Sequence, residues 1–136
     1  MKQGTRVMVV DDESIVCERL MKHLTGEGFE VETFTDSAQA IERLDSGPAF
    51  EVVVTDLKMK GPTGLDVMHH VSGNSPGTQV IIITGYASIE AAREAEYTGV
   101  FDFINKPFKL ETMAALVKKA AKKAGKDRRF KGGGGA

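Results

Sequence analysis

Five short apolar runs alternate along the chain with segments of helical periodicity, and this alternation constrains the fold more than any other feature of the sequence. Three of the runs are nearly continuous in Val, Ile and Met, as in strands covered on both faces, whereas the second run alternates and is expected at a sheet edge. Strands and helices in alternation predict an α/β fold: a doubly wound, five-stranded parallel sheet with helices on both faces. The five runs cover residues 6–10, 29–34, 51–55, 80–84 and 100–104.

The segments between the runs carry apolar residues at helical spacing and have identifiable ends. Residues 36–39 have the spacing of a capping box before the second helix, and Ser88 is expected to cap the fourth. The third helix is predicted from about residue 64 to residue 71, where the stretch 73–77, containing Gly and Pro, stops it. In the first helix, Ile15 is expected on the buried face.

Length and composition are those of one globular domain, because a single core usually serves about 100–200 residues. No apolar stretch reaches the roughly 18 residues that span a bilayer, and the start of the chain has no signal-peptide pattern. We therefore expect a cytoplasmic protein without a membrane partner. The lone Cys17 fits a reducing compartment and excludes an internal disulfide, and its polar neighbours favour a packed thiol over a nucleophile.

Charge is distributed unevenly along the chain. From Lys118 onward eight Lys and Arg residues stand against one Asp, a balance of +7, so the net charge of −1 leaves −8 on the preceding residues. We expect a folded domain over residues 1–124 and a basic, Gly-rich tail without fixed structure over 125–136. Nucleic-acid binding is not expected of the acidic folded domain.

Two of the predicted strands finish in acids: Asp11 and Asp12 follow the first run, and Asp56 follows the third. In open parallel sheets the functional crevice lies beyond the carboxyl ends of the strands. Thr84 and Lys106 follow the fourth and fifth runs, so all five residues are predicted to meet at one edge. Crowded carboxylates repel one another unless a cation or hydrogen bonds compensate, which indicates a site for a divalent hard cation.

Asp56 is the candidate nucleophile, because aspartate accepts phosphoryl groups to form an acyl phosphate. Mg²⁺ suits such a reaction, since it binds carboxylates, water and phosphate oxygens. We expect Asp12, Asp56 and the backbone carbonyl of Lys58 as direct ligands, with Asp11 in support behind them. A structural alternative treats Asp11, Asp12 and Glu13 as an acidic helix start, which the helix dipole stabilises.

The remaining candidates each have a plainer interpretation. The ammonium of Lys106 can neutralise a carboxylate before reaction and a phosphoryl oxygen after it, although a lysine before proline is usually an exposed loop residue. Thr84 can donate its hydroxyl to a phosphoryl group, or simply end a strand as a β-branched residue. Phe103 is either a core residue of an alternating strand or a side chain that switches position.

With these motifs the chain closely resembles the response-regulator receiver domain of two-component signalling, over residues 4–124. The stretch from Gly99 to Phe108 looks most like the same stretch in receivers of enhancer-binding transcription activators and of hybrid kinases. The motifs are specific in combination and stand at family-like spacing: Asp11-Asp12, Asp56-Leu-Lys-Met59, Gly64-Leu65, Thr84-Gly-Tyr86 and Lys106-Pro107-Phe108.

The resemblance implies a flavodoxin-like strand order, 2-1-3-4-5, and a phosphoacceptor switch. Asp56 would take a phosphoryl group from the phosphohistidine of a sensor histidine kinase or phosphotransfer protein, with Mg²⁺. Thr84, Phe103 and Lys106 would couple it to the face built by the fourth helix, fifth strand and fifth helix, which serves a partner, an output domain or a phosphorylation-dependent homodimer. Such a domain is not otherwise an enzyme, because it catalyses only its own phosphotransfer and autodephosphorylation.

Two departures from the family pattern stand out. The common Met-Pro after the phosphorylated aspartate is replaced by Met59-Lys60, with Pro62 two places later, and Phe103 stands where Tyr is frequent. Lys58 and Tyr86 occupy positions that tune phosphate lifetime in relatives. No DNA-binding or catalytic output domain is recognisable, so we expect either a single-domain regulator or a receiver cut from a longer protein.

Three alternative functions share the predicted fold or some of these residues. A haloacid-dehalogenase-like phosphatase also forms an aspartyl phosphate with magnesium, but it carries a second acid two residues after its nucleophile, where this chain has Lys58. A receiver that binds partners without phosphorylation would not need the intact set of acids, Thr84 and Lys106. A flavodoxin-like carrier of FMN would need a phosphate loop rich in Ser, Thr and Gly after the first strand, where acids stand instead.

Overall fold

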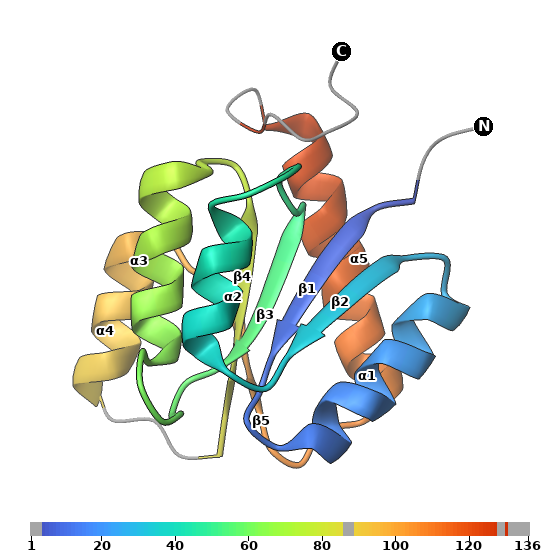
Figure 1. The fold of residues 1–136 in the computed structure, drawn as a ribbon, viewed down its shortest axis with the longest axis horizontal. Helices are drawn as coiled ribbons and strands as arrows, with labels where there is room; N and C mark the ends of the chain where they lie inside the picture. Colours follow the sequence, from blue (N-terminus) through green and yellow to red (C-terminus); the bar gives the residue numbers. More distant parts are fainter. Residues whose placement is uncertain (1–3, 86–88, 128–129, 131–136) are drawn as a thin grey trace.

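The computed structural model describes residues 4–85, 89–127 and 130, and its centre is a parallel five-stranded sheet (Figure 1). The strand order is β2-β1-β3-β4-β5, and every neighbouring pair is parallel. This confirms the predicted topology and the edge position of the second strand. The strands are β1 (Arg6–Val10), β2 (Glu30–Phe34), β3 (Val52–Asp56), β4 (Gln79–Thr84) and β5 (Asp102–Asn105).

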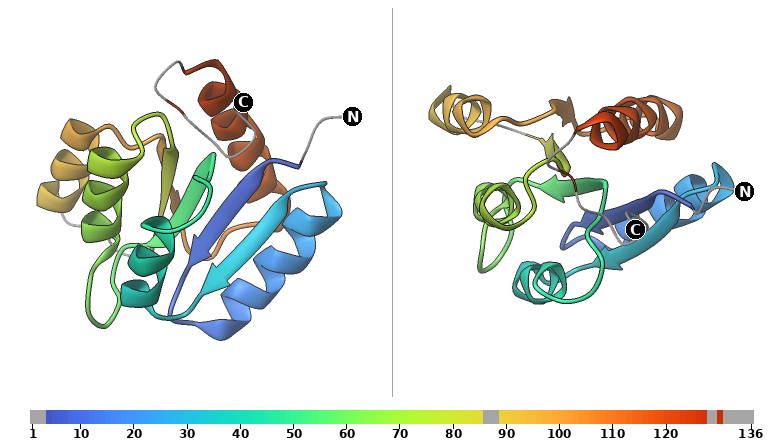
Figure 2. Two further views of the ribbon diagram at one scale, coloured as in Figure 1. Left: turned by 45° about the horizontal axis from the view of Figure 1, so that its top comes forward. Right: turned by 90° about the horizontal axis from the view of Figure 1, so that it is seen from above.

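Helices cover both faces of the sheet, as the alternation predicts (Figure 2). Helices α1 and α5 pack on one face, and α2, α3 and α4 pack on the other. Within the described residues, no helix is both long and apolar enough to cross a membrane. The helices are α1 (Ser14–Gly26), α2 (Ser37–Leu44), α3 (Gly64–Asn74), α4 (Ile89–Thr98) and α5 (Leu110–Lys126).

The three central strands are buried on both faces, which is why their sequences are continuously apolar. Successive side chains of a strand point to opposite faces. In β1, Val7 and Val9 therefore join the core against α1 and α5, whereas Met8 and Val10 join the core against α2, α3 and α4. Packing on both faces therefore fixes the positions of the strands and of their carboxyl ends.

Helix ends agree with the sequence in part. The Asp36 carboxylate caps α2 by accepting the backbone N–H groups of Ala38 at 2.8 Å and Gln39 at 3.3 Å, but the Gln39 side chain does not complete the predicted capping box. Helix α3 continues three residues beyond its predicted end, because Gly73 has helical geometry and the chain turns only after Asn74. The cap expected from Ser88 lies outside the described residues.

Ile15 corrects the prediction for the first helix, because 48% of its surface is exposed. The buried residues of α1 are Cys17, Leu20 and Leu24, which follow one another at helical spacing. Residues two apart on a helix do not face the same side, so Ile15 is directed away from the stripe that Cys17 begins. An exposed isoleucine stands instead near the carboxyl edge of the sheet.

A charged network fixes the edge strand β2. Glu32 accepts hydrogen bonds from Arg43 Nε at 2.9 Å and Nη2 at 3.0 Å, and from Arg6 Nη2 at 3.3 Å. Both guanidinium groups lie over the ring of Phe50, at 4.9 and 5.1 Å from its centre. The Arg43 hydrogen bond is the main reason that the pKa of Glu32 is lowered.

We expect Glu32→Gln to make the unfolding free energy less dependent on pH between 6 and 3. Because the pKa of Glu32 is lowered in the folded protein, its stabilising effect is complete above the unfolded value of about 4.3 and is lost as pH falls through the folded value. Urea unfolding at both pH values measures the difference. The exposed carboxylate change Glu18→Gln is the control, and equal pH dependence in wild type and Glu32→Gln would refute the prediction.

Candidate functional site

The strands deliver the predicted residues to one edge of the sheet. Asp11 directly follows β1, Asp56 and Thr84 end β3 and β4, and Lys106 directly follows β5. Carboxylate oxygens of Asp11, Asp12 and Asp56 lie within 4.8 Å of one another. The grouping confirms the prediction that these residues meet where the parallel strands end.

Lys106 reaches into the acidic cluster. Its Nζ lies 3.1 Å from Asp11 Oδ2 and 3.4 Å from Asp56 Oδ2. A third acid, Glu13, accepts a hydrogen bond from the same Nζ at 2.6 Å. The peptide bond between Lys106 and Pro107 is cis.

Burial sets the electrostatics of the site. Asp11 is completely buried and Asp56 is 8% exposed, and this desolvation raises the pKa of both carboxyl groups. The charge of Asp11 raises the pKa of Asp56 further, while Lys106 acts to lower both. For Lys106, burial acts to lower the pKa, but the hydrogen bonds and charges of Glu13, Asp11 and Asp56 outweigh it and raise the pKa.

The acidic cluster fits a hard divalent cation. Asp11 Oδ1 accepts the backbone N–H of Glu13 at 2.9 Å. Its Oδ2 is buried and, although close to the Lys106 ammonium, has no hydrogen bond of acceptable geometry. Together with the oxygens of Asp12 and Asp56, this oxygen forms a group of carboxylate oxygens. Mg²⁺ prefers oxygen ligands of this kind.

A cavity of about 240 Å³ opens above the nucleophile candidate. The residues that line it are Asp56, Leu57, Lys58, Thr84, Gly85 and Lys106. Thr84 is 4% exposed, whereas Lys58 extends toward solvent. The cavity therefore places a carboxylate, a threonine and an ammonium around one space.

Phe103 lies on β5, which is separated from the strand of Asp56 by β4. Its ring is half-buried and packs with the core that includes Ala95 of α4. This position joins the site strand to α4, but it does not line the cavity. Tyr86 of the family-like motif lies outside the described residues.

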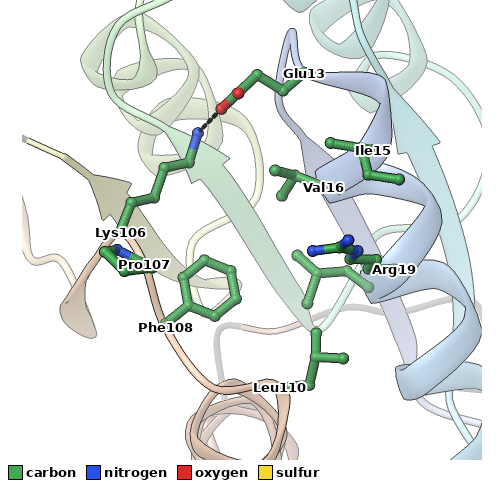
Figure 3. Close-up of a pocket in the computed structure, with 9 residues that line it drawn as sticks. Glu13, Ile15, Val16, Arg19, Lys106, Pro107, Phe108 and Leu110 are labelled. Atoms are coloured by element: carbon green, nitrogen blue, oxygen red, sulfur yellow. Dashed lines mark hydrogen bonds and ion pairs between the residues drawn. The ribbon is translucent and has the colours of Figure 1, made fainter.

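Sequence reasoning missed the part of the site that faces α1. Figure 3 shows Glu13 reaching across to Lys106 above a largely apolar groove of about 540 Å³. The groove runs between α1 and the connection from β5 to α5, and the exposed Ile15 contributes to one wall. Glu13 was visible only as part of an acidic helix start, because no local pattern reveals a contact across 93 residues.

Cys17 lies beneath the acidic loop. It is 4% exposed, and its Sγ donates to the carbonyl oxygen of Asp11 at 3.3 Å. Burial, reinforced by the charge of Asp11, raises the pKa of the thiol to about 11. A thiol this weakly acidic is a packing group, as the sequence indicates, rather than a nucleophile.

The connection from β3 to α3 passes very close to the site. Thr63 and Asp66 form a complete capping box at the start of α3, and the N–H of Gly64 donates to the carbonyl of Leu57 at 2.8 Å. A Cβ on Gly64 would overlap the carbonyl oxygen of Asp56 and lie 2.9 Å from Leu57 Cα. Only glycine allows this approach of the two backbones.

A doubly wound sheet of order 2-1-3-4-5 with an acidic, lysine-containing pocket at its carboxyl edge defines a class of α/β signalling domains. The chain belongs to the response regulator receiver domain family, whose model matches residues 7–118. The resemblance drawn from the motifs is therefore confirmed.

Curated relatives include transcriptional regulators. Over 114 residues the chain is 35% identical to the DNA-binding transcriptional regulator NtrC of Escherichia coli (strain K12), covering 84% of this chain and 24% of that protein. It is 31% identical to the acid tolerance regulatory protein ActR of Rhizobium meliloti (strain 1021), covering 83% of this chain and 58% of that protein. The chain thus spans about a quarter of the length of NtrC.

Solved structures agree with the fold. The beryllofluoride-activated NtrC4 receiver domain dimer is 32% identical, with a TM-score of 0.79 and coverage of 88% of this chain and 98% of that chain. A CheY-like receiver domain protein from Methanospirillum hungatei JF-1 is 24% identical, with a TM-score of 0.86 and coverage of 90% and 98%. At that lower identity the likeness concerns the fold alone.

We expect Gly64→Ala to destabilise the domain by about 1–3 kcal/mol, because backbone atoms of the β3–α3 connection must shift to admit the methyl group. Urea unfolding measures the loss. Gly73→Ala is the matched control in the same helix: its Cβ would meet nothing within 4 Å, so helix propensity predicts a gain of up to about 1 kcal/mol. Equal stability changes in the two variants would refute the close-contact argument.

Proposed function

We propose that this receiver domain is a phosphoacceptor switch in which Asp56 receives a phosphoryl group, with Mg²⁺ as cofactor. One observation carries the proposal: the Asp56 carboxylate shares one cavity with Thr84 and Lys106 and also borders the oxygen cluster that suits a hard cation. The phosphoryl group would come from the phosphohistidine of a sensor histidine kinase or phosphotransfer protein.

In the transfer, a carboxylate oxygen of Asp56 attacks phosphorus and forms the P–O bond of an acyl phosphate. The P–N bond to the donor imidazole breaks, and the imidazole leaves with the electron pair and takes up a proton. Thr84 donates its hydroxyl to a phosphoryl oxygen, and the ammonium of Lys106 offsets the negative charge that remains. Bound magnesium would neutralise charge on the transferring oxygens.

The direct magnesium ligands that we propose are Asp12, Asp56 and the backbone carbonyl of Lys58. Asp11 supports them from behind, because one of its oxygens already accepts the N–H of Glu13 and the residue is completely buried. Asp12 is exposed and free to approach an ion from the solvent side. This division of roles follows the sequence prediction.

The surroundings of the site favour a protein as the phosphoryl donor. The apolar groove borders Lys106, so a partner that fills it would bring its own side chain close to Asp56. A phosphatase of the haloacid-dehalogenase type is disfavoured, because the residue two places after Asp56 is Lys58 rather than an acid. The domain would therefore act on itself only, through phosphotransfer and autodephosphorylation.

The output of the switch is proposed to be the face of α4, β5 and α5. Phe103 lies on β5 beside β4 and packs against the core cluster to which Ala95 of α4 belongs, so a change around Thr84 and Lys106 would reach this face through β5. The alternative, an interaction module that works without phosphorylation, does not use the intact site.

Partners on this face would be an output domain in a longer protein or a second copy in a phosphorylation-dependent homodimer. The solved NtrC4 receiver domain dimer supports the second. The buried, unpaired thiol of Cys17 suits the cytoplasm.

Asp56→Asn should abolish phosphorylation by acetyl phosphate in the presence of magnesium, because the amide replaces the nucleophilic oxygen. Intact mass spectrometry counts the phosphoryl groups, and wild type should gain one. Asp45→Asn, at an exposed acid at the end of α2, should be labelled like wild type. A phosphoryl group on Asp56→Asn would show that another residue is the acceptor.

Magnesium should raise the melting temperature of wild type more than that of Asp12→Ala, because a ligand that binds only the folded state stabilises it more when it binds more tightly. When a chelator removes magnesium, Asp12→Ala should melt at a higher temperature than wild type, since removal of one acid relieves like-charge repulsion in the cluster. Thermal unfolding with and without magnesium tests both statements. A lower melting temperature of the variant in chelator would contradict the repulsion argument.

A further inference from the structure

Glu13 holds an unusual position for its residue type. It is the N-cap of α1, yet its side chain makes no hydrogen bond to the N–H groups of the first helical turn. Ser, Thr, Asp and Asn are the residues favoured at this position, because their short side chains reach those groups. The Glu13 carboxylate instead extends across the groove and accepts a hydrogen bond from Lys106 at 2.6 Å (Figure 3).

Lys106 is therefore shared among three carboxylates at unequal distances. Its Nζ is 2.6 Å from Glu13, 3.1 Å from Asp11 and 3.4 Å from Asp56. The nearest acceptor of the site lysine is thus an acid outside the predicted set, and the candidate nucleophile is the most distant of the three. The arrangement describes the protein before any group has been added to Asp56.

We propose that Glu13 is a positioning residue that competes with the phosphoryl group on Asp56 for the ammonium of Lys106. The proposal rests on the proposed function, and it assigns to Glu13 a control over how tightly the site holds a phosphoryl group. A group added to Asp56 brings new anionic oxygens close to Lys106. These oxygens draw the ammonium toward Asp56 and away from Glu13, and the weakening of the short hydrogen bond to Glu13 opposes phosphorylation.

The size of the effect follows from exposure. The Glu13 side chain is 58% exposed and that of Lys106 is 22% exposed. Ion pairs that are largely exposed contribute enough to change an equilibrium by about two- to five-fold. Removal of the Glu13 contact should therefore strengthen binding of a phosphoryl mimic by about that factor, with no change in the residues that contact the mimic.

Two variants distinguish the effect of the Glu13–Lys106 contact from the effect of the negative charge of Glu13. Glu13→Gln removes the charge, whereas Glu13→Asp keeps the charge but shortens the side chain by one carbon–carbon bond of about 1.5 Å. Aspartate at an N-cap also accepts hydrogen bonds from the first turn of its own helix, which draws it away from Lys106. If the contact matters, both variants should bind the mimic more tightly than wild type.

The test is a titration of the full chain with beryllofluoride at saturating magnesium, followed by NMR amide shifts. Glu13→Gln and Glu13→Asp are each expected to lower the half-saturating concentration by about two- to five-fold. The exposed acid change Glu18→Gln, five residues further along the chain in α1, is the control for net charge and should leave the half-saturating concentration unchanged. Thermal unfolding of each variant confirms that the fold is intact.

The outcomes distinguish this proposal from the proposed function. If wild type fails to bind beryllofluoride with magnesium, the phosphoacceptor function is wrong and the role of Glu13 is wrong with it. If wild type binds but Glu13→Asp behaves like wild type while Glu13→Gln binds more tightly, charge alone acts and the competition is refuted. Unchanged binding in both variants also refutes it.

A double-mutant cycle with Lys106→Gln adds a second readout. If Glu13 acts through Lys106, the gain from Glu13→Gln should disappear in the Lys106→Gln background, because interacting residues have non-additive effects. Half-saturating concentrations for the four proteins give the coupling directly. An equal gain in both backgrounds would overturn the proposal, since Glu13 would then act independently of the lysine.

Discussion

The site depends on the burial of two carboxylates, Asp11 and Asp56, at the carboxyl edge of a parallel sheet. Burial raises the pKa of both, and the charge of Asp11 adds to the effect on Asp56. Lys106 offsets part of this cost from the opposite side of the cluster. Oxygens of Asp11, Asp12 and Asp56 still lie close together, so the cluster retains capacity for a cation.

The packed core of the fold holds these carboxylates together despite their repulsion. Strands β1 and β3 are neighbours at the centre of the sheet, and their residues are buried against helices on both faces. A strand held on both sides cannot easily shift along its axis, because a shift of one residue would turn each side chain to the opposite face. The acids at the strand ends are therefore held close together by the core rather than by the loop that contains them.

Much of this could be predicted from the sequence. The parallel sheet follows from the apolar runs, and the common edge of Asp56, Thr84 and Lys106 follows from the rule that parallel strands end together. The orientation of Ile15 could not be read reliably, because the residues of a first helical turn fit more than one helical face. Glu13 escaped notice because its partner lies in a distant connection, and local patterns carry no information about such contacts.

The close approach of Gly64 to the backbone of Asp56 also determines which elements around the site have room to move. Helix α3 begins against the Asp56 carbonyl without space for a single methyl group, so this side is a rigid wall. The cavity beside the Asp56 side chain is lined by Leu57 and Lys58 and also by Thr84, Gly85 and Lys106, which belong to the last two strands and their connections. A group that occupies this cavity therefore touches the ends of β4 and β5 directly, while the start of α3 has no space in which to move toward Asp56.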